Sequence, residues 1–151
     1  SQQQATKVLA ELSLPGRMQW LSKTPGILLD VAHNPQSAGY LAAQLKFIKA
    51  GYARVYLLVG MLKDKDIQQS LAPFHQLADH WHLVDLPGAR GAQASLLLQQ
   101  LPAQSSYSCY SDLESGYQQA LLSMQANDLL VIFGSFVTVS AVLALQKETD
   151  V

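Results

Sequence analysis

Short apolar segments alternate along this chain with longer segments of helical periodicity, and this alternation restricts the fold more than any other feature. The segments expected to form strands are residues 17–22, 27–32, 54–61, 80–86, 107–110 and 128–134, and those expected to form helices are residues 35–50, 64–79, 92–101, 112–126 and 135–148. Such alternation produces βαβ crossovers, which give a largely parallel sheet with helices on both faces. We therefore expect an α/β fold, with the very apolar segment 128–134 as a central strand.

The start of the chain departs from this parallel pattern. Segments 17–22 and 27–32 are separated only by the turn sequence KTPG, which contains Pro25 and Gly26. Because so short a link allows only an antiparallel pair, the first strand should form a hairpin with the second. Residues 1–14 are expected to form a short lead-in helix.

Length and composition indicate one cytoplasmic domain. A chain of 151 residues with 49% hydrophobic residues suits a single domain over residues 1–151. The charged fraction of 14% is low, which suggests that another domain covers part of the surface. Cys109 is the single cysteine, so no internal disulfide can form, and the start has no signal-peptide pattern. No apolar run approaches the roughly 20 residues of a membrane span.

Charge excludes nucleic acid as an expected partner, and the histidines do not indicate a metal. The ten basic residues form no stripe and the net charge is -1. His80 and His82 should share one strand face with Trp81 on the other, but no cysteine is near and a helix end separates His75. We expect no metal site, and Cys109 should be a small buried apolar residue rather than a nucleophile.

Polar and glycine-bearing segments follow several of the expected strands, where ligands bind in open parallel sheets. These segments contain Asp30, His33 and Asn34, then GMLKDKD at residues 60–66, DLPGARG at residues 85–91, and Gly134 with Ser135. Each also has a purely structural interpretation: Asp30 or Asn34 can cap the next helix, the charges of residues 63–66 can be a solvated helix start, and Ser135 can be a cap. Their clustering at one edge nevertheless predicts a binding site.

Several catalytic motifs are missing from the sequence. It contains neither a G-x-x-x-x-G-K-[ST] loop nor a G-x-G-x-x-G fingerprint, and no G-x-S-x-G elbow. We assign no catalytic nucleophile. If this domain contacts ATP, another domain should hold the phosphates.

Four segments, in this order, carry a family resemblance: LPGRMQWL, ILLDVAHNPQSAGYL, VGMLKDKDI and VIFGSFVTVSAVL. Over about residues 14–145 the chain resembles the C-terminal domain of the bifunctional dihydrofolate synthase/folylpolyglutamate synthases, within the Mur ligase family. The resemblance implies a Rossmann-like three-layer domain of about six strands, mostly parallel with one antiparallel strand. It also implies a larger N-terminal ATPase domain, absent from this chain, that carries the phosphate-binding loop and the magnesium sites.

The resemblance implies an ATP-dependent ligase of folate biosynthesis. In such enzymes ATP, with Mg²⁺, phosphorylates a carboxylate of dihydropteroate or folate, and the amine of L-glutamate attacks the acyl phosphate to form an amide. The expected partners are therefore the N-terminal ATPase domain, L-glutamate and dihydropteroate or folate. The enzyme is expected to be a monomer, and this domain alone should be inactive.

The resemblance also implies roles for individual residues. Arg17 matches an arginine that reaches the ATP phosphates, and Asp30 matches an aspartate that contacts the ribose. His33 and Asn34 match adjoining cleft residues that orient the nucleotide or glutamate. Ser135 lies where the family handles the incoming amino acid, although Val137 stands where the family commonly has histidine.

Two other functions remain open from the residues. A stand-alone nucleotide- or small-molecule-binding module would keep measurable nucleotide affinity by itself. A receiver-like interaction domain would place a lysine after the last strand, whereas Gly134 and Ser135 stand there.

Overall fold

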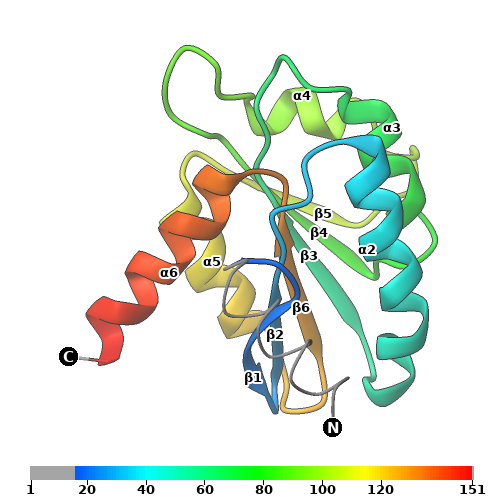
Figure 1. Cartoon of the computed structure of the whole chain (residues 1–151), viewed down its shortest axis with the longest axis vertical. Coiled ribbons are helices and arrows are strands. Elements are labelled where there is room, and N and C mark those ends of the chain that lie inside the picture. Colours follow the sequence, from blue (N-terminus) through cyan, green and yellow to red (C-terminus); the bar gives the residue numbers. More distant parts are fainter. Residues whose placement is uncertain (1–15, 151) are drawn as a thin grey trace, which may run out of the picture.

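The computed structural model describes residues 16–150, and the expected lead-in helix before residue 15 lies outside the described residues. One six-stranded sheet forms the centre, in the order β1-β2-β6-β3-β4-β5 (Figure 1). Its strands are β1 (Gln19–Lys23), β2 (Gly26–Leu29), β3 (Val55–Val59), β4 (His80–Val84), β5 (Tyr107–Tyr110) and β6 (Leu129–Phe133). Among these six strands β1 and β2 pair antiparallel and the other pairs are parallel, which confirms the predicted hairpin and largely parallel sheet.

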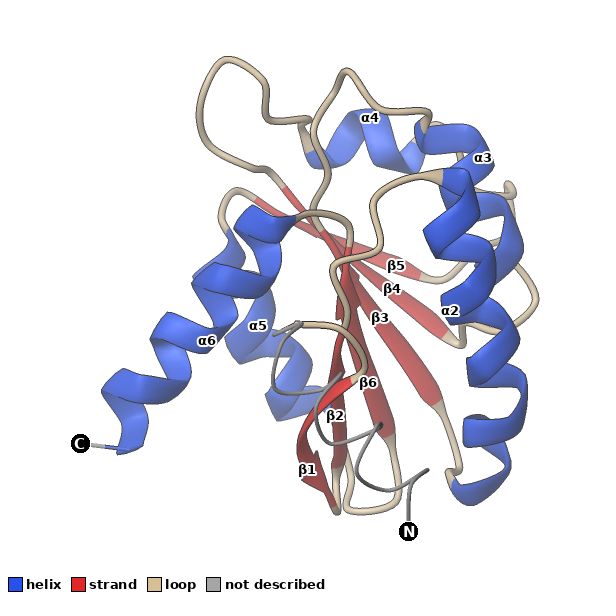
Figure 2. Ribbon diagram, viewed as in Figure 1, coloured by secondary structure: helices blue, strands red, loops and turns tan. Residues whose placement is uncertain are grey.

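Helices cover both faces of the sheet, as predicted (Figure 2). They are α2 (Pro35–Ile48), α3 (Ile67–Leu71), α4 (Ala94–Leu98), α5 (Leu113–Ser123) and α6 (Phe136–Asp150), with short 3₁₀ turns η1 (Lys49–Gly51) and η2 (Ala72–Phe74). Side chains of α2, α3 and α4 pack in one apolar cluster, and those of α5 and α6 pack in a second. Within the described residues, no helix is both long and apolar enough to cross a membrane.

The central strand β6 is buried on both sides, which confirms its predicted position. All five of its residues are buried, and it pairs with β2 and with β3. Because side chains alternate along a strand, Val131 faces the α2 side while Leu130 and Ile132 face the α6 side.

The helix predicted over residues 64–79 is much shorter in the structure. Asp66 caps α3 by accepting a hydrogen bond from the Gln69 N–H at 3.2 Å, and the α-helix ends at Leu71. Pro73 then falls in the 3₁₀ turn η2. Proline has no N–H to donate back along a helix, so it ends the regular hydrogen-bond pattern there.

The prediction that Cys109 is buried is wrong. Its side chain is exposed, and so is that of Tyr107 on the same face of β5. The physical reason is the strand order, which makes β5 the outermost strand with a neighbour on one side only. Partial burial and the Asp85 carboxylate raise the pKa of the Cys109 thiol, which disfavours the reactive thiolate.

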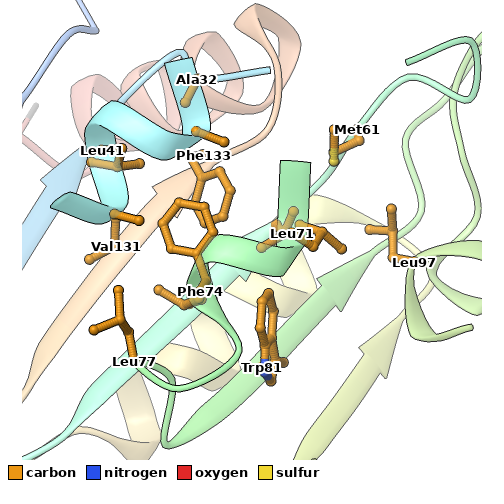
Figure 3. Close-up of a cluster of buried hydrophobic side chains, with 14 of the residues drawn as sticks. Ala32, Leu41, Met61, Leu71, Phe74, Leu77, Trp81, Leu97, Val131 and Phe133 are labelled. Atoms are coloured by element: carbon orange, nitrogen blue, oxygen red, sulfur yellow. The ribbon is translucent and has the colours of Figure 1, made fainter. Parts of the chain in front are cut away.

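Aromatic packing joins η2 to the central strand. The rings of Phe74 and Phe133 lie 4.5 Å apart, and both residues are almost fully buried (Figure 3). Both rings belong to the apolar cluster that also contains Leu71 and Trp81.

We predict that Phe74→Ala lowers the free energy of unfolding by about 3–5 kcal/mol, because it removes a buried ring and leaves a cavity. Phe47 is 80% exposed, so Phe47→Ala serves as the matched control and should change stability by less than about 0.5 kcal/mol. Urea unfolding followed by circular dichroism measures both. Equal losses in the two variants would contradict this assignment of the core.

Candidate functional site

Three loops meet where β2, β6 and β3 end. The Gly134 N–H, after β6, donates to the Ala32 carbonyl, after β2, at 2.9 Å. Gly134 has a φ of +123°, and a Cβ built there would lie 2.3 Å from the carbonyl oxygen of Gly60, after β3. Only glycine can take this conformation at this distance from a neighbouring backbone. The predicted convergence of polar loops at one edge of the sheet is therefore present.

Asp30 places a buried carboxyl group at this edge of the sheet. Its side chain is 6% exposed, and its two oxygens accept from the Ala32 N–H at 2.8 Å and the Met18 N–H at 3.0 Å. These bonds tie the turn before β1 to the loop after β2. Burial raises the pKa of the Asp30 carboxyl above its ordinary value, while the two N–H donors and the Arg17 guanidinium act in the opposite direction.

Asn34, rather than Asp30, caps α2. Its side-chain oxygen accepts from the Ser37 N–H at 2.8 Å, and the Ser37 hydroxyl oxygen accepts from the Asn34 N–H at 3.3 Å. Pro35 occupies the first turn, as predicted. The cap uses the amide oxygen, and within residues 16–150 the Asn34 side-chain NH₂ group has no acceptor, while Asn34 lines the pocket described below.

The His33 ring has a defined tautomer. Its Nδ1 lies 2.8 Å from the Val31 carbonyl oxygen, which can only accept, so Nδ1 carries the proton. In the neutral ring, Nε2 is then the acceptor. The Phe136 ring, at the start of α6, lies 5.9 Å from the imidazole and supports it from the side.

A pocket of about 430 Å³ brings four predicted site residues together. Its lining contains Arg17, Asp30, His33, Asn34, Gln36, Ser37 and Tyr40. The guanidinium of Arg17 is exposed, whereas Asp30 is buried beside it. The ligand roles assigned to these four residues stay predictions.

The sequence interpretation missed Gln36, Ser37 and Tyr40. Tyr40 is 61% exposed, although a tyrosine on a helix usually buries much of its ring. All three lie in the first two turns of α2, so their spacing after Asn34 was the available signal.

Ser135 does not line this pocket. It is 3% exposed, and its hydroxyl oxygen accepts from the Thr138 N–H at 3.0 Å, which is the cap-like arrangement considered above. The Thr138 hydroxyl donates to the Gly60 carbonyl oxygen at 2.8 Å. Because that proton is used, the Ser135 hydroxyl is the donor in its 2.9 Å contact with the Thr138 hydroxyl. Its predicted substrate role stays a prediction.

A larger pocket, of about 670 Å³, lies beside α5 near the amino ends of β3 and β4. His80 and His82 lie on the face of β4 that lines this pocket, and Trp81 lies on the opposite face, as predicted. Three of the four ring nitrogens of these histidines form hydrogen bonds. Those of His80 bond to Ser106 and Ser108, and Nδ1 of His82 bonds to the Tyr110 hydroxyl. Within residues 16–150, no group of three or more His, Cys, Asp or Glu is placed to hold a metal ion. The candidate site is the pocket of about 430 Å³, because it lies at the carboxyl edge of the sheet and is lined by four of the predicted residues.

Comparison with known proteins defines the class to which this fold and site belong. The family model described as "Mur ligase, glutamate ligase domain" matches residues 16–136, which is most of the chain. The chain belongs to this family. This agrees with the resemblance carried by the four sequence segments.

Named relatives point to one kind of enzyme within the family. The dihydrofolate synthase/folylpolyglutamate synthase of Buchnera aphidicola (strain APS) is 37% identical over 93% of this chain and 34% of its own length. That of Escherichia coli K12 is 37% identical over 89% of this chain and 31% of its own length. The chain thus spans about a third of the length of the curated relatives it matches.

Solved structures of such enzymes share the fold. The bifunctional folylpolyglutamate synthase/dihydrofolate synthase of Yersinia pestis, complexed with AMPPNP and Mn ion, is 40% identical with a TM-score of 0.81, over 89% of this chain and 32% of that one. E. coli FolC in complex with DHPP and ADP is 35% identical with a TM-score of 0.85, over 91% of this chain and 32% of that one. The Rossmann-like three-layer prediction is confirmed.

We predict that His82 makes folding depend on pH. Burial, and secondarily His80, lower the pKa of His82 from 6.5 to about 4. Between pH 4 and pH 6.5 the His82 ring is therefore protonated in the unfolded chain but not in the folded chain. The contribution of neutral His82 to the free energy of unfolding is complete above pH 6.5 and is lost as the pH falls toward 4. At ~1.4 kcal/mol per pKa unit, the loss is about 3 kcal/mol.

Urea unfolding at several pH values between 4 and 7.5 tests this prediction against His82→Phe, in which the ring volume remains but the titration is removed. The variant should show a weaker fall in stability with acid. Parallel stability curves for the two proteins would contradict it.

Proposed function

We propose that this chain is the C-terminal domain of an ATP-dependent ligase that adds L-glutamate to dihydropteroate and folates through an acyl phosphate. The observation that carries the proposal is the pocket at the carboxyl edge of the sheet, where Arg17, Asp30, His33 and Asn34 meet in a chain of the glutamate ligase domain family. The Yersinia relative binds the ATP analogue AMPPNP, which supports ATP as the nucleotide.

Arg17 supplies an exposed positive charge at this site. A guanidinium stays charged at all working pH values and pairs its parallel N–H groups with phosphate oxygens. The turn that carries Arg17 is anchored through the Met18 N–H to Asp30. Arg17 can therefore reach the ATP phosphates from a backbone of fixed position.

Asp30, His33 and Asn34 present complementary groups to the rest of the ligand. Each Asp30 oxygen accepts one backbone N–H and keeps a further lone pair for a ribose hydroxyl. His33 offers Nε2 as an acceptor, and Asn34 offers its NH₂ group as a donor. Donors and acceptors are thus both fixed on the loop and helix start after β2, as orientation of a nucleotide or of glutamate requires.

We place the incoming L-glutamate near the start of α6, on the side of the Phe136 ring that faces away from His33. Ser135 acts there through its cap, which orients the first turn of α6, rather than through a free hydroxyl. Val137 is 45% exposed at this position, so the imidazole common in the family is replaced by an apolar surface.

The described residues do not fit Mg²⁺ as a resident ion. No cluster of three or more His, Cys, Asp or Glu side chains is suitably placed within residues 16–150. Mg²⁺ requires several oxygen ligands in octahedral geometry. We therefore assign its ligands to the N-terminal ATPase domain and to ATP.

The proposal makes the N-terminal ATPase domain the essential partner. Half of the cleft lies in that domain, so this chain alone should have no ligase activity. We further propose that the complete enzyme is a cytoplasmic monomer, which size-exclusion chromatography with light scattering would test for oligomeric state.

Activity can be tested by joining this chain to the preceding part of the Yersinia pestis relative. ATP-dependent phosphate release should require both L-glutamate and dihydropteroate. The intact Yersinia enzyme is the positive control. A folded chimera without activity, beside an active control, would refute the ligase proposal. If the isolated chain binds ATP as tightly as the active chimera does, the stand-alone nucleotide-binding module becomes the better description.

Within the chimera, we predict that Arg17→Ala and Asp30→Ala each reduce kcat at least about 100-fold, because phosphate and ribose contacts position the reacting groups. Arg54→Ala and Asp128→Asn are the matched controls, since Arg54 is exposed and Asp128 buried at the opposite end of the sheet. Both controls should keep kcat within about threefold. Wild-type rates in the Arg17 and Asp30 variants, with circular dichroism unchanged in all four, would limit these residues to structural roles.

A further inference from the structure

The Thr138 side chain joins two loops that are far apart in sequence. Its hydroxyl donates to the Gly60 carbonyl oxygen at 2.8 Å, across 78 positions, and it is fully buried. The hydroxyl also accepts from Ser135 at 2.9 Å. One hydroxyl therefore connects the end of β3 to the first turn of α6.

The space around this contact is tightly filled. A Cβ built on Gly60 would lie 2.8 Å from the Thr138 hydroxyl oxygen, and one built on Gly134 would lie 2.3 Å from the Gly60 oxygen. Neither position has room for a side chain. The two loops are joined by the Thr138 bond to Gly60 and by the bond from the Gly60 N–H to the Phe133 carbonyl oxygen at 3.4 Å.

The same contacts continue to the candidate pocket. The Gly134 N–H donates to the Ala32 carbonyl oxygen at 2.9 Å, and the Ala32 N–H donates to Asp30 at 2.8 Å. The Gly60 N–H donates to the carbonyl oxygen of Phe133, the residue before Gly134, at 3.4 Å, so a series of hydrogen bonds runs from Asp30 through Ala32 and this loop to Gly60 and Thr138.

Segment 61–66 directly follows Gly60 and carries Lys63 and Lys65. The Lys63 N–H donates to the Arg90 carbonyl oxygen at 2.8 Å, which holds this segment at a second point. The Met61 carbonyl oxygen also accepts from the Ala92 N–H at 2.9 Å, and Asp64 pairs with Arg90 at 2.8 Å, so residues 90–92 hold the rest of the segment. The Gly60 backbone, from which the segment starts, is held by Thr138 and by the bond from the Gly60 N–H to the Phe133 carbonyl oxygen at 3.4 Å.

We propose that Thr138 is a positioning residue for the glutamate-adding reaction: it fixes Gly60, from which segment 61–66 starts, and the α6 start relative to the nucleotide pocket. This inference rests on the proposed function. In it, Thr138 does not contact a substrate but acts through its hydrogen bonds to Gly60 and Ser135. Transfer between two bound groups is sensitive to displacements of about 1 Å, so loosening this contact should impair the step that uses L-glutamate.

Two substitutions separate the hydroxyl from the shape of the side chain. Thr138→Val has nearly the same volume but cannot donate to Gly60, whereas Thr138→Ser keeps the hydroxyl. Thr149→Val is a matched control on the same helix, because Thr149 is exposed and its hydroxyl donates to the Leu145 carbonyl oxygen within α6 at 3.0 Å.

The first measurement uses this chain itself and does not depend on catalysis. In ¹H–¹⁵N NMR spectra, Thr138→Val should shift the amide resonances of segment 61–66 and of Ala32, and should speed their hydrogen exchange. Thr138→Ser and Thr149→Val should leave these signals close to wild type. Unchanged resonances in folded Thr138→Val would overturn the proposed coupling.

The second measurement uses the active chimera. Thr138→Val should lower kcat/KM for L-glutamate at least about tenfold while KM for ATP changes by less than about threefold. Thr138→Ser should restore kcat/KM to within about threefold of wild type. Equal effects on both substrates, or none, would overturn the positioning role, whereas an inactive wild-type chimera would count against the ligase proposal and leave the NMR result to decide the coupling.

Discussion

The burial of the central strand β6 determines how the rest of the structure is arranged. All five residues of β6 are buried and their side chains alternate between two apolar clusters, so each face of the sheet must be covered by helices. Parallel strands joined by those helices all end on the same side. The loops there cannot pack into either helical layer, and they carry backbone groups that need hydrogen bonds. Polar chemistry accordingly gathers at the carboxyl edge.

Asp30 shows how the cost of burying a charge can be offset locally. A buried carboxylate is unfavourable unless it is hydrogen-bonded, and here two backbone N–H groups donate to it. The same bonds hold the turn that carries Arg17, so the side chain to which we assign a ribose contact also organises its surroundings. Asn34 has a comparable position: its oxygen caps α2, and we assign its NH₂ group to the ligand in our proposal.

Most of the fold was predictable because local patterns encode it. The alternation of apolar and amphipathic segments predicted every strand, the hairpin and the central place of β6. The errors arose where another constraint prevailed. Pro73 shortened a helix that its periodicity had extended, and the exposure of Cys109 depended on strand order, which no local pattern in β5 contains.

The site was predictable to a lesser extent. The sequence predicted that Asp30, His33 and Asn34 follow a strand at one edge, since the direction of parallel strands decides which ends meet. Arg17 was assigned to the site only through the family resemblance. Only the tertiary structure decided between the open alternatives: that Asn34 forms the cap, that Asp30 fastens two loops together, and that Ser135 is buried against Thr138. These outcomes depend on hydrogen bonds and steric contacts between segments distant in sequence, such as Thr138 and Gly60, and such contacts are defined only once the sheet has assembled.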